Sequence, residues 1–369
     1  MYLNKPVITI TGTNGKGSCA AVCEAILSAQ GYKVGCYTSP HLVKFNERIR
    51  YNNQSASDDE IQKAYIDIDP NLGYFQQATQ AALKIFESKN LDAYILEVGI
   101  GGRLDPVNLS VEPDVSIITS IDLDHMDRLG ATREKIGFEK AHIFRSGKPA
   151  ICGDENVPDS VRQYADKIKA DLYYYKQNYF FEEFSDHWNW WNKSIRYENL
   201  ALPKLYIQNI AAALQALSVF PCDISREAIN IGLEKAFLPG RFQIISKPIL
   251  QILDVAHNPA SARLLAKRLK LLSCEGKTIA VIGMLKDKDI EGTLVPMLNL
   301  VDIWHVATID DPRGASCVEI AKFIPNKSIL FDNPTLAYQA ALEKAAPNDR
   351  IIVFGSFRTV GEIMGEKIS

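Results

Sequence analysis

The sequence predicts an α/β protein made of two domains, each with a parallel sheet covered by helices. The first reason is pattern, because short β-branched apolar runs alternate with longer amphipathic stretches, as in strand–helix–strand units. The second reason is size, since 369 residues exceed what one hydrophobic core usually holds. A Pro-Gly-Arg turn at 239–241 separates two such alternations. We therefore expect domains at 1–240 and 241–369.

The first predicted strand, 7–10, leads into a glycine-rich turn, and a helix is predicted over 16–30. Glycines let backbone N–H groups face an anion, the helix N-terminus adds positive potential, and Lys16 can reach outer phosphates. The turn departs from the common P-loop pattern, with Ile10 at the first glycine position and Gly17 in place of the hydroxyl. We expect a variant P-loop whose magnesium-binding hydroxyl comes from elsewhere. The alternative is a tight turn without a ligand.

Polar residues end several strands of the first domain. Further strands are predicted at 34–38, 93–98 and 115–119, and helices from 58 and at 77–88, 205–219 and 225–235. Because the C-terminal ends of parallel strands meet at one edge of the sheet, ligands gather there. Ser39, Glu97, Asp124 and His125 end or follow these strands, beside the turn that carries Lys16. The sequence thus predicts one site at this edge.

These side chains suit magnesium, which prefers hard oxygen ligands and takes few of them from protein. Glu97 supplies charge, and Ser39 can supply the hydroxyl that Gly17 lacks. His125 is a less usual magnesium ligand, so it is either a ligand or a structural histidine. The alternative for Glu97 is a solvated carboxylate at a strand end. The three glycines at 99, 101 and 102 favour close approach by a ligand instead.

The remaining chain contains an aromatic segment and a second alternation of strands and helices. We interpret the aromatic residues at 173–191 as a strand pair packed on the domain rather than a ring-stacking surface. After residue 241, strands are predicted at 250–255, 278–282, 302–306 and 350–354, and helices at 259–272 and 335–346. This pattern predicts a second, smaller doubly wound domain.

Composition excludes several classes of protein. The net charge of −3 gives no reason to expect nucleic acid or a membrane surface as a partner. No apolar run approaches the roughly 20 residues that cross a bilayer. Seven cysteines without a Cys-x-x-Cys pair suit a reducing compartment better than disulfides or zinc. We expect a cytoplasmic monomer that acts on small molecules.

Nine ordered motifs together resemble one family. They lie at 11–18 (Thr-Gly-Thr-Asn-Gly-Lys-Gly-Ser), 38–41 (Thr-Ser-Pro-His), 96–105, 124–125, 139–141, 239–242, 254–259, 281–289 and 354–357. In sequence and order they resemble the folylpolyglutamate synthases, and more closely the bacterial bifunctional dihydrofolate synthase/folylpolyglutamate synthases of the Mur ligase superfamily. The resemblance implies a P-loop ATP-binding parallel-sheet domain with a pterin site, followed by a smaller Rossmann-like α/β glutamate ligase domain.

The resemblance also implies an activity. It is an ATP-dependent amide ligase that adds L-glutamate to dihydropteroate and to folyl-polyglutamate through an acyl phosphate. The family usually has several helical turns before the P-loop strand, and this chain has almost none. The alternatives are therefore a monofunctional folylpolyglutamate synthase or an impaired ATP-binding homologue that lacks the N-terminal segment. A ligase acting on a peptidoglycan precursor and a non-catalytic ATP-dependent switch are less well supported, because the motifs extend through the second domain.

The resemblance assigns roles to particular residues. ATP contacts fall on Thr13, Asn14, Gly15, Lys16, Gly17, Ser18, Asn209, Arg241 and Asp254. One or two magnesium ions are assigned to Ser39, Glu97, His125 and Lys140, and the family often carries the last as a carbamate. Lys16, Lys140 and His257 are the catalytic candidates, and the pterin falls on Gly73, Tyr74, Phe75, Gln76 and Leu104. Without the resemblance, Lys140 could equally be a surface lysine and His257 a structural histidine.

One substrate loop departs from the family pattern. At 73–76 the sequence reads Gly-Tyr-Phe-Gln, where the family pattern begins with Thr and ends with Glu. The rings of Tyr74 and Phe75 remain as stacking groups. The missing carboxylate weakens the expectation of dihydropteroate as a substrate more than the expectation of glutamate addition to folates.

Overall fold

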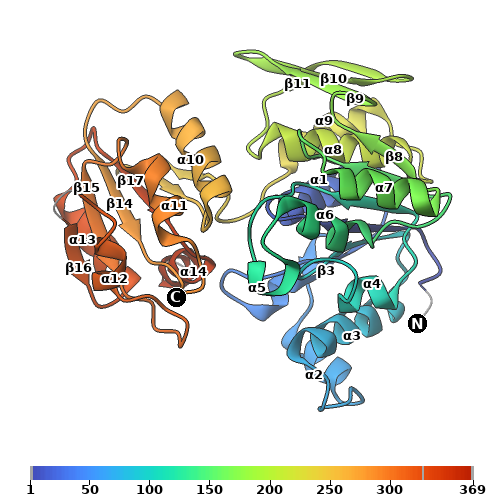
Figure 1. Cartoon of the computed structure of the whole chain (residues 1–369), viewed down its shortest axis with the longest axis horizontal. Coiled ribbons are helices and arrows are strands. Elements are labelled where there is room, and N and C mark those ends of the chain that lie inside the picture. The colour runs from blue at the N-terminus through green and yellow to red at the C-terminus, as the bar shows by residue number, and fades with distance from the viewer. Residues whose placement is uncertain (1–2, 326–327, 367–369) are drawn as a thin grey trace. The chain divides into compact units, whose positions relative to one another are not determined.

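The computed structural model describes residues 3–325 and 328–366, and it divides into two compact units. The first unit ends at Leu238 and the second begins at Pro239. In the first, an eight-stranded sheet has the order β4-β3-β2-β5-β1-β6-β7-β8 (Figure 1). Its strands are β1 (Val7–Thr11), β2 (Val34–Tyr37), β3 (Ile49–Tyr51), β4 (Gln54–Ser55), β5 (Ala93–Glu97), β6 (Val115–Ile118), β7 (Pro149–Cys152) and β8 (Asp171–Tyr174). From β2 to β8 neighbouring strands pair in parallel, and β3 and β4 add an antiparallel edge.

Helices cover both faces of this sheet. They are α1 (Lys16–Ala29), α2 (Asp58–Tyr65), α3 (Tyr74–Glu87), α4 (Pro106–Ser110), α5 (Met126–Leu129), α6 (Arg133–Ala141), α7 (Asp159–Ile168), α8 (Ile207–Ser218) and α9 (Arg226–Lys235), with the short 3-10 turn η1 (Phe45–Arg48). Residues of α1, α8 and α9 pack in one apolar core, and residues of α3, α6 and α7 pack in another. Strand β1 contributes Ile8 and Ile10 to the first core and Val7 to the second. Alternation along the strand therefore places the sheet between two buried layers.

The aromatic segment forms most of a small antiparallel sheet. It consists of β9 (Tyr179–Glu183), β10 (His187–Asn192) and β11 (Arg196–Ala201). Trp188 and Trp190 are fully buried, and Trp190 Nε1 donates to Ala211 O in α8 at 3.1 Å. Figure 1 shows this sheet beyond α8 and α9. The predicted strand pair is confirmed for β9 and β10, whereas the tyrosines at 173 and 174 lie in β8 of the main sheet.

The second unit holds a six-stranded sheet in the order β12-β13-β17-β14-β15-β16. Its elements are β12 (Gln243–Ile245), β13 (Leu250–Leu253), α10 (Pro259–Leu271), β14 (Thr278–Ile282), α11 (Ile290–Leu294), η2 (Val295–Met297), β15 (Ile303–Ala307), α12 (Cys317–Ala321), β16 (Ser328–Phe331), α13 (Pro334–Lys344), β17 (Arg350–Phe354) and α14 (Phe357–Glu366). In this sheet β12 pairs antiparallel with β13, and the other neighbouring strands pair in parallel. The predicted α/β fold class is confirmed for both units.

One helix begins earlier than its apolar pattern predicts. The expected helix at 77–88 is α3, and it starts at Tyr74. Gln76 lies in the first turn, where its Oε1 accepts the N–H of Gly73 at 3.1 Å. This capping contact satisfies a donor that the helix itself leaves open. Residues 74–76 are therefore helical rather than a loop.

Within residues 3–325 and 328–366, no helix combines the length and apolar character that crossing a bilayer requires.

Close contact between α9 and α1 depends on a glycine. A Cβ added at Gly232 would lie 2.5 Å from Ile26 Cγ1 and 2.6 Å from Ile26 Cα. We predict that Gly232→Ala lowers the free energy of unfolding by about 1–3 kcal/mol, because α1 must shift. Thermal melts check this prediction. Asn230→Ala, at an exposed position of the same helix, should leave the melting midpoint nearly unchanged, and equal midpoints for both variants would contradict the packing argument.

Candidate active site

The turn between β1 and α1 is fixed by hydrogen bonds to the segment that follows β6. Thr13 N–H donates to Ser120 O at 2.7 Å, and Asn14 N–H donates to Ser120 Oγ at 3.1 Å. The hydroxyl of Thr119 donates to Asn14 O at 2.6 Å. Gly15 precedes the helix with φ +88°, a conformation that favours glycine. The turn is thus fixed ahead of the N-terminus of α1, where backbone N–H groups can bind a phosphate.

Two more predicted ATP contacts lie at this turn. A Cβ on Gly15 would come within 2.6 Å of Asn209 Cγ, so the Asn209 side chain from the start of α8 lies against the turn. Lys16 Nζ donates to Gly12 O at 3.1 Å. The structure therefore brings Asn209 and the P-loop together although about 190 residues separate them in sequence.

Ser39 and Glu97 meet at the same edge of the sheet. Strands β2 and β5 are parallel neighbours, and Ser39 N–H donates to Glu97 Oε2 at 3.0 Å. Glu97 is only 2% exposed. A Cβ on Gly17 would lie 3.7 Å from Glu97 Oε2, so this carboxylate faces the first turn of α1. The sequence-predicted grouping of Ser39, Glu97 and the P-loop is present in the structure.

Lys140 is buried near other charged groups rather than exposed on a helix surface. It lies in α6 and is 2% exposed. Its pKa is lowered to about 7, first by burial and then by the positive charge of Lys16, against the opposing effect of Asp124 and Asp105. The surface-lysine interpretation is therefore wrong. An amine with this pKa is partly neutral near pH 7 and can act as a nucleophile.

His125 adopts an unusual backbone conformation beside these groups. It has φ +50° immediately before α5, and its N–H donates to Asp124 Oδ1 at 2.9 Å. Left-handed backbone is uncommon outside glycine and often marks functional turns. Its role as a metal ligand stays a prediction.

The donor set can be compared with what magnesium prefers. No group of three or more His, Cys, Asp or Glu side chains is arranged to hold a metal in the described part of the chain. At this edge Ser39, a hydroxyl-bearing residue, meets the Glu97 carboxylate through its backbone N–H. Magnesium binds through one or two carboxylates, keeps several waters and bridges phosphates. Residues at this edge therefore fit a magnesium–nucleotide complex.

Asp105 is a buried carboxylate whose part in this region the sequence did not reveal. Its Oδ2 accepts the N–H groups of Gly99 and Ile100 at 3.0 and 3.3 Å, and its Oδ1 accepts that of Val107 at 2.9 Å. Burial raises its pKa to about 6 although these N–H groups and Lys16 lower it. Asp105 thus shapes the glycine-rich turn after Glu97. Its position directly before Pro106 is typical of a helix N-cap residue.

The predicted pterin residues point in different directions. A Cβ on Gly99 would lie 2.7 Å from the Phe75 ring, so Phe75 packs directly on the glycine-rich turn. Tyr74 is 60% exposed and Leu104 is 71% exposed. The Gln76 amide is engaged with Gly73. Phe75 therefore contacts the glycine-rich turn that follows Glu97.

Two predicted residues of the second unit, Arg241 and His257, lie near the ring of Phe357, to which the sequence assigned no site role. The Arg241 guanidinium lies 4.7 Å from the centre of the Phe357 ring, and the His257 ring lies 5.8 Å from it. Asp254 is buried and accepts the N–H groups of Phe242 and Ala256, each at 2.8 Å. Burial raises the pKa of Asp254, and Arg241 partly offsets this rise. Cation–ring contact fixes Arg241 without neutralising its charge.

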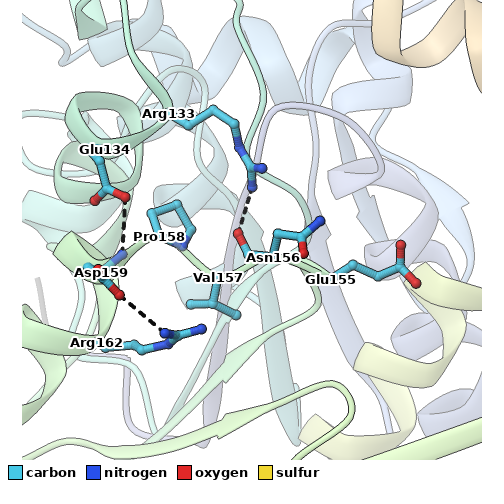
Figure 2. Close-up of a pocket in the computed structure, with 8 residues that line it drawn as sticks. All are labelled: Arg133, Glu134, Glu155, Asn156, Val157, Pro158, Asp159 and Arg162. Atoms are coloured by element: carbon cyan, nitrogen blue, oxygen red, sulfur yellow. Dashed lines mark hydrogen bonds and ion pairs between the residues drawn. The ribbon is translucent and has the colours of Figure 1, made fainter.

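A separate hollow of about 380 Å³ lies between α6 and α7 (Figure 2). Its charged side chains bind one another and the backbone. Arg133 Nη2 donates to Asn156 O at 2.8 Å, Arg162 pairs with Asp159 at 3.2 Å, and Glu134 accepts the Asp159 N–H at 3.2 Å. None of the predicted site residues lines this hollow. We do not place the active site there.

Two family profiles match the chain in order. The Mur ligase middle domain matches residues 10–217, and the glutamate ligase domain of Mur ligases matches residues 240–357. The fold and the P-loop site are therefore those of a Mur ligase. A dihydrofolate synthase/folylpolyglutamate synthase from Escherichia coli (strain K12) is 44% identical over 365 residues, covering 97% of this chain and 86% of that protein. The chain belongs to the dihydrofolate synthase/folylpolyglutamate synthase family of Mur ligases.

Solved structures agree with this membership. The E. coli FolC structure in complex with DHPP and ADP has a TM-score of 0.95 at 42% identity, with 98% of this chain and 88% of that chain covered. A bifunctional enzyme from Yersinia pestis complexed with AMPPNP and Mn ion has a TM-score of 0.94 at 42% identity, with 99% and 89% covered. A second relative, from Haemophilus influenzae, is 40% identical over 96% of this chain and 87% of that protein. The resemblance read from the motifs is confirmed.

The buried Lys140 amine predicts a pH dependence of stability. Its ordinary pKa is 10.5 and its pKa in the fold is about 7. Between these values the unfolded chain binds a proton that the native chain does not, so stability rises with pH. We predict that Lys140→Met is more stable than the parent near pH 7 in carbonate-free buffer, and that the difference shrinks towards pH 10.5. Urea unfolding measures it, and a difference independent of pH would refute the burial argument.

Proposed function

We propose that this chain is an ATP-dependent ligase that joins L-glutamate to the carboxyl group of a pteroyl acid. The observation that carries the proposal is the meeting of the P-loop, Ser39 and the Glu97 carboxylate at one edge of the sheet. The relatives with the highest identity named above are bifunctional, so we propose dihydropteroate and folyl-polyglutamate as acceptors of glutamate. The first unit, about 1–240, would bind ATP and the pterin, and the second, about 241–369, would serve as the glutamate ligase domain.

The reaction needs activation because a carboxylate is a poor acyl donor. The substrate carboxylate attacks the γ-phosphorus of ATP, which gives an acyl phosphate and ADP. The glutamate amine then attacks the acyl carbon, loses a proton, and phosphate leaves. Backbone N–H groups at 13–17 would bind the phosphates, and Lys16 would stabilise charge on the transferred group. Bound magnesium would neutralise phosphoryl oxygens.

The remaining roles are assigned by position and resemblance. For ATP we propose Thr13, Asn14, Gly15, Lys16, Gly17, Ser18, Asn209, Arg241 and Asp254; for one or two magnesium ions, Ser39, Glu97, His125 and Lys140; for the pterin, Gly73, Tyr74, Phe75, Gln76 and Leu104. His257 would orient the nucleotide or the intermediate, and its ring contact with Phe357 supports a fixed orientation. The monomeric state stays a prediction.

A second candidate function is a monofunctional folylpolyglutamate synthase. It is favoured by Gln76, which stands where the family pattern has a carboxylate and whose amide caps α3 through Gly73. A carboxylate at this position would form a charge-assisted hydrogen bond with a pterin N–H group, and an amide cannot supply that negative charge. The two candidates differ in whether dihydropteroate is accepted.

Release of ADP separates these functions. We expect turnover with ATP, magnesium and L-glutamate when either dihydropteroate or tetrahydrofolate is supplied. Lys16→Ala should reduce the rate roughly 100-fold or more, because charge stabilisation of the transferred phosphoryl group is lost. Lys63→Ala, at an exposed position of α2, is the matched control and should retain full activity.

The outcomes are distinct. Turnover with tetrahydrofolate alone would establish the monofunctional enzyme. Absence of turnover with both acceptors, while ATP still binds, would reject the ligase and leave an ATP-binding homologue.

We further propose that Lys140 carries a carbamate. Its neutral amine would attack carbon dioxide, forming an N–C bond and releasing one proton, and the resulting anion could bind a second magnesium. The low pKa of this buried amine supports the proposal. With ¹³C-labelled bicarbonate we predict a carbamate resonance in the parent that is missing in Lys140→Arg. The same spectrum from both proteins would rule out this modification.

A further inference from the structure

The strand next to β2 carries an arginine whose guanidinium is bonded at every N–H. Arg50 lies in β3, directly opposite Cys36 of β2. Nε and Nη2 reach the carboxylate of Glu24 at 3.1 and 2.7 Å. Nη1 donates to Thr38 Oγ1 at 3.0 Å and to Glu47 O at 2.7 Å, and Nη2 also donates to Cys36 Sγ at 3.2 Å. Five donors therefore meet acceptors from three separate elements.

The Nη1 contacts close a loop that contains Ser39. We call residues 38–47 the Ser39 loop. Arg50 contacts its first residue through the Thr38 hydroxyl and its last through the Glu47 carbonyl. Inside the loop, the Glu47 carboxylate accepts the N–H groups of Leu42, Val43 and Lys44 at 2.7, 2.9 and 2.7 Å. Arg50 thus joins both ends of a loop that is also fixed internally.

The other side of the guanidinium contacts the helix of the P-loop. Glu24 lies on α1, two turns beyond Lys16, and its side chain is 7% exposed. A carboxylate at this depth is strongly destabilising unless it is paired and hydrogen-bonded. The two-point contact with Arg50 satisfies that requirement and fixes the direction of the guanidinium. Movement of α1 relative to the Ser39 loop would therefore break it.

Ser39 sits at the end of this chain of contacts. Thr38 N–H donates to Arg48 O at 2.9 Å, and the next residue, Ser39, donates its N–H to Glu97 Oε2 at 3.0 Å. Thr38 is consequently bonded to Arg48 through its backbone N–H and to Arg50 through its side-chain hydroxyl. The contact of Ser39 with Glu97 lies one residue from the Arg50 contact.

From this arrangement we propose that Arg50 is a positioning residue that fixes Ser39 and the P-loop helix relative to each other, so that the metal and phosphate contacts are set together. This inference rests on the proposed function for the role of Ser39. The competing explanation is that the Arg50–Glu24 pair only stabilises the fold. Buried ion pairs contribute little net stability when compared with apolar replacements. If the pair only stabilises the fold, substitution should change stability and leave metal affinity unchanged. If Arg50 is a positioning residue, substitution should also lower metal affinity.

The test uses the full chain and measures Mn²⁺ binding in the presence of AMPPNP by electron paramagnetic resonance. Arg50→Lys keeps the charge but cannot form the five-donor fork. Thr38→Val keeps the shape and removes one of the two acceptors of Nη1. We expect each variant to raise the dissociation constant for Mn²⁺ roughly three- to tenfold, near the low end reported for groups that orient metal ligands. The double variant should show no more than the larger single effect, because both changes break one contact.

The control is another buried arginine. Arg350 in β17 donates to Thr278 Oγ1 at 2.8 Å and to the carbonyls of Leu269 and Leu272 at 3.0 and 2.9 Å. Arg350→Lys should lower the melting temperature without changing Mn²⁺ affinity. A lowered melting temperature for Arg50→Lys with unchanged Mn²⁺ affinity would overturn the proposal, as would additive effects of the two substitutions.

The test does not depend on a single variant or on the ligase activity of the parent. If Arg50→Lys does not fold, Thr38→Val decides alone, and unchanged Mn²⁺ affinity in that variant overturns the proposal. The ligase assay of the parent is a separate measurement. A parent that releases no ADP, but whose Mn²⁺ affinity depends on Arg50 and Thr38, would reject the proposed function and retain the positioning role.

Discussion

Parallel pairing of β1 with β5 and β6 is the constraint on which the site depends. Ile10 lies opposite Glu97 on one side, and Thr11 lies opposite Ile118 on the other. Because parallel strands in register end at the same level, the P-loop, the glycine-rich turn and the segment with His125 all leave the sheet together. A hydrogen bond from Thr13 N–H to Ser120 O then joins the P-loop to the segment that follows β6. No single loop contains the site, and the register of the sheet assembles it.

Burial gives the assembled groups their chemical character. Glu97 and Lys140 are both within 2% of full burial, where a charge interacts strongly with its neighbours because water does not screen it. Opposite responses follow from one cause: burial raises the pKa of Asp105 and lowers that of Lys140. Arg50 and Glu24 meet the same environment with a fully bonded ion pair. The first unit therefore contains a fully bonded buried ion pair beside buried groups whose pKa values are shifted by burial.

Much of the fold and the centre of the site could be predicted from the sequence. Strand alternation located β1, β5 and β6, and the rule that ligands bind at strand ends grouped Ser39 with Glu97. Contacts between distant segments could not be read in this way. The burial of Lys140 depends on where α6 packs, and Asn209 reaches Gly15 only through the position of α8. The apolar pattern also could not predict where α3 begins, because Gln76 caps this helix through a polar contact with Gly73. The motif resemblance supplied what periodicity could not.

The packing of Trp190 on α8 has an optical consequence. Its indole is fully buried and bonded to Ala211 O, two residues along the same helix from Asn209. Asn209 in turn lies against Gly15 of the P-loop. A chromophore whose emission depends on its surroundings is thus fixed to the helix that contacts the P-loop turn. Trp190, one of four tryptophans in the chain, is therefore an intrinsic fluorophore bonded to that helix.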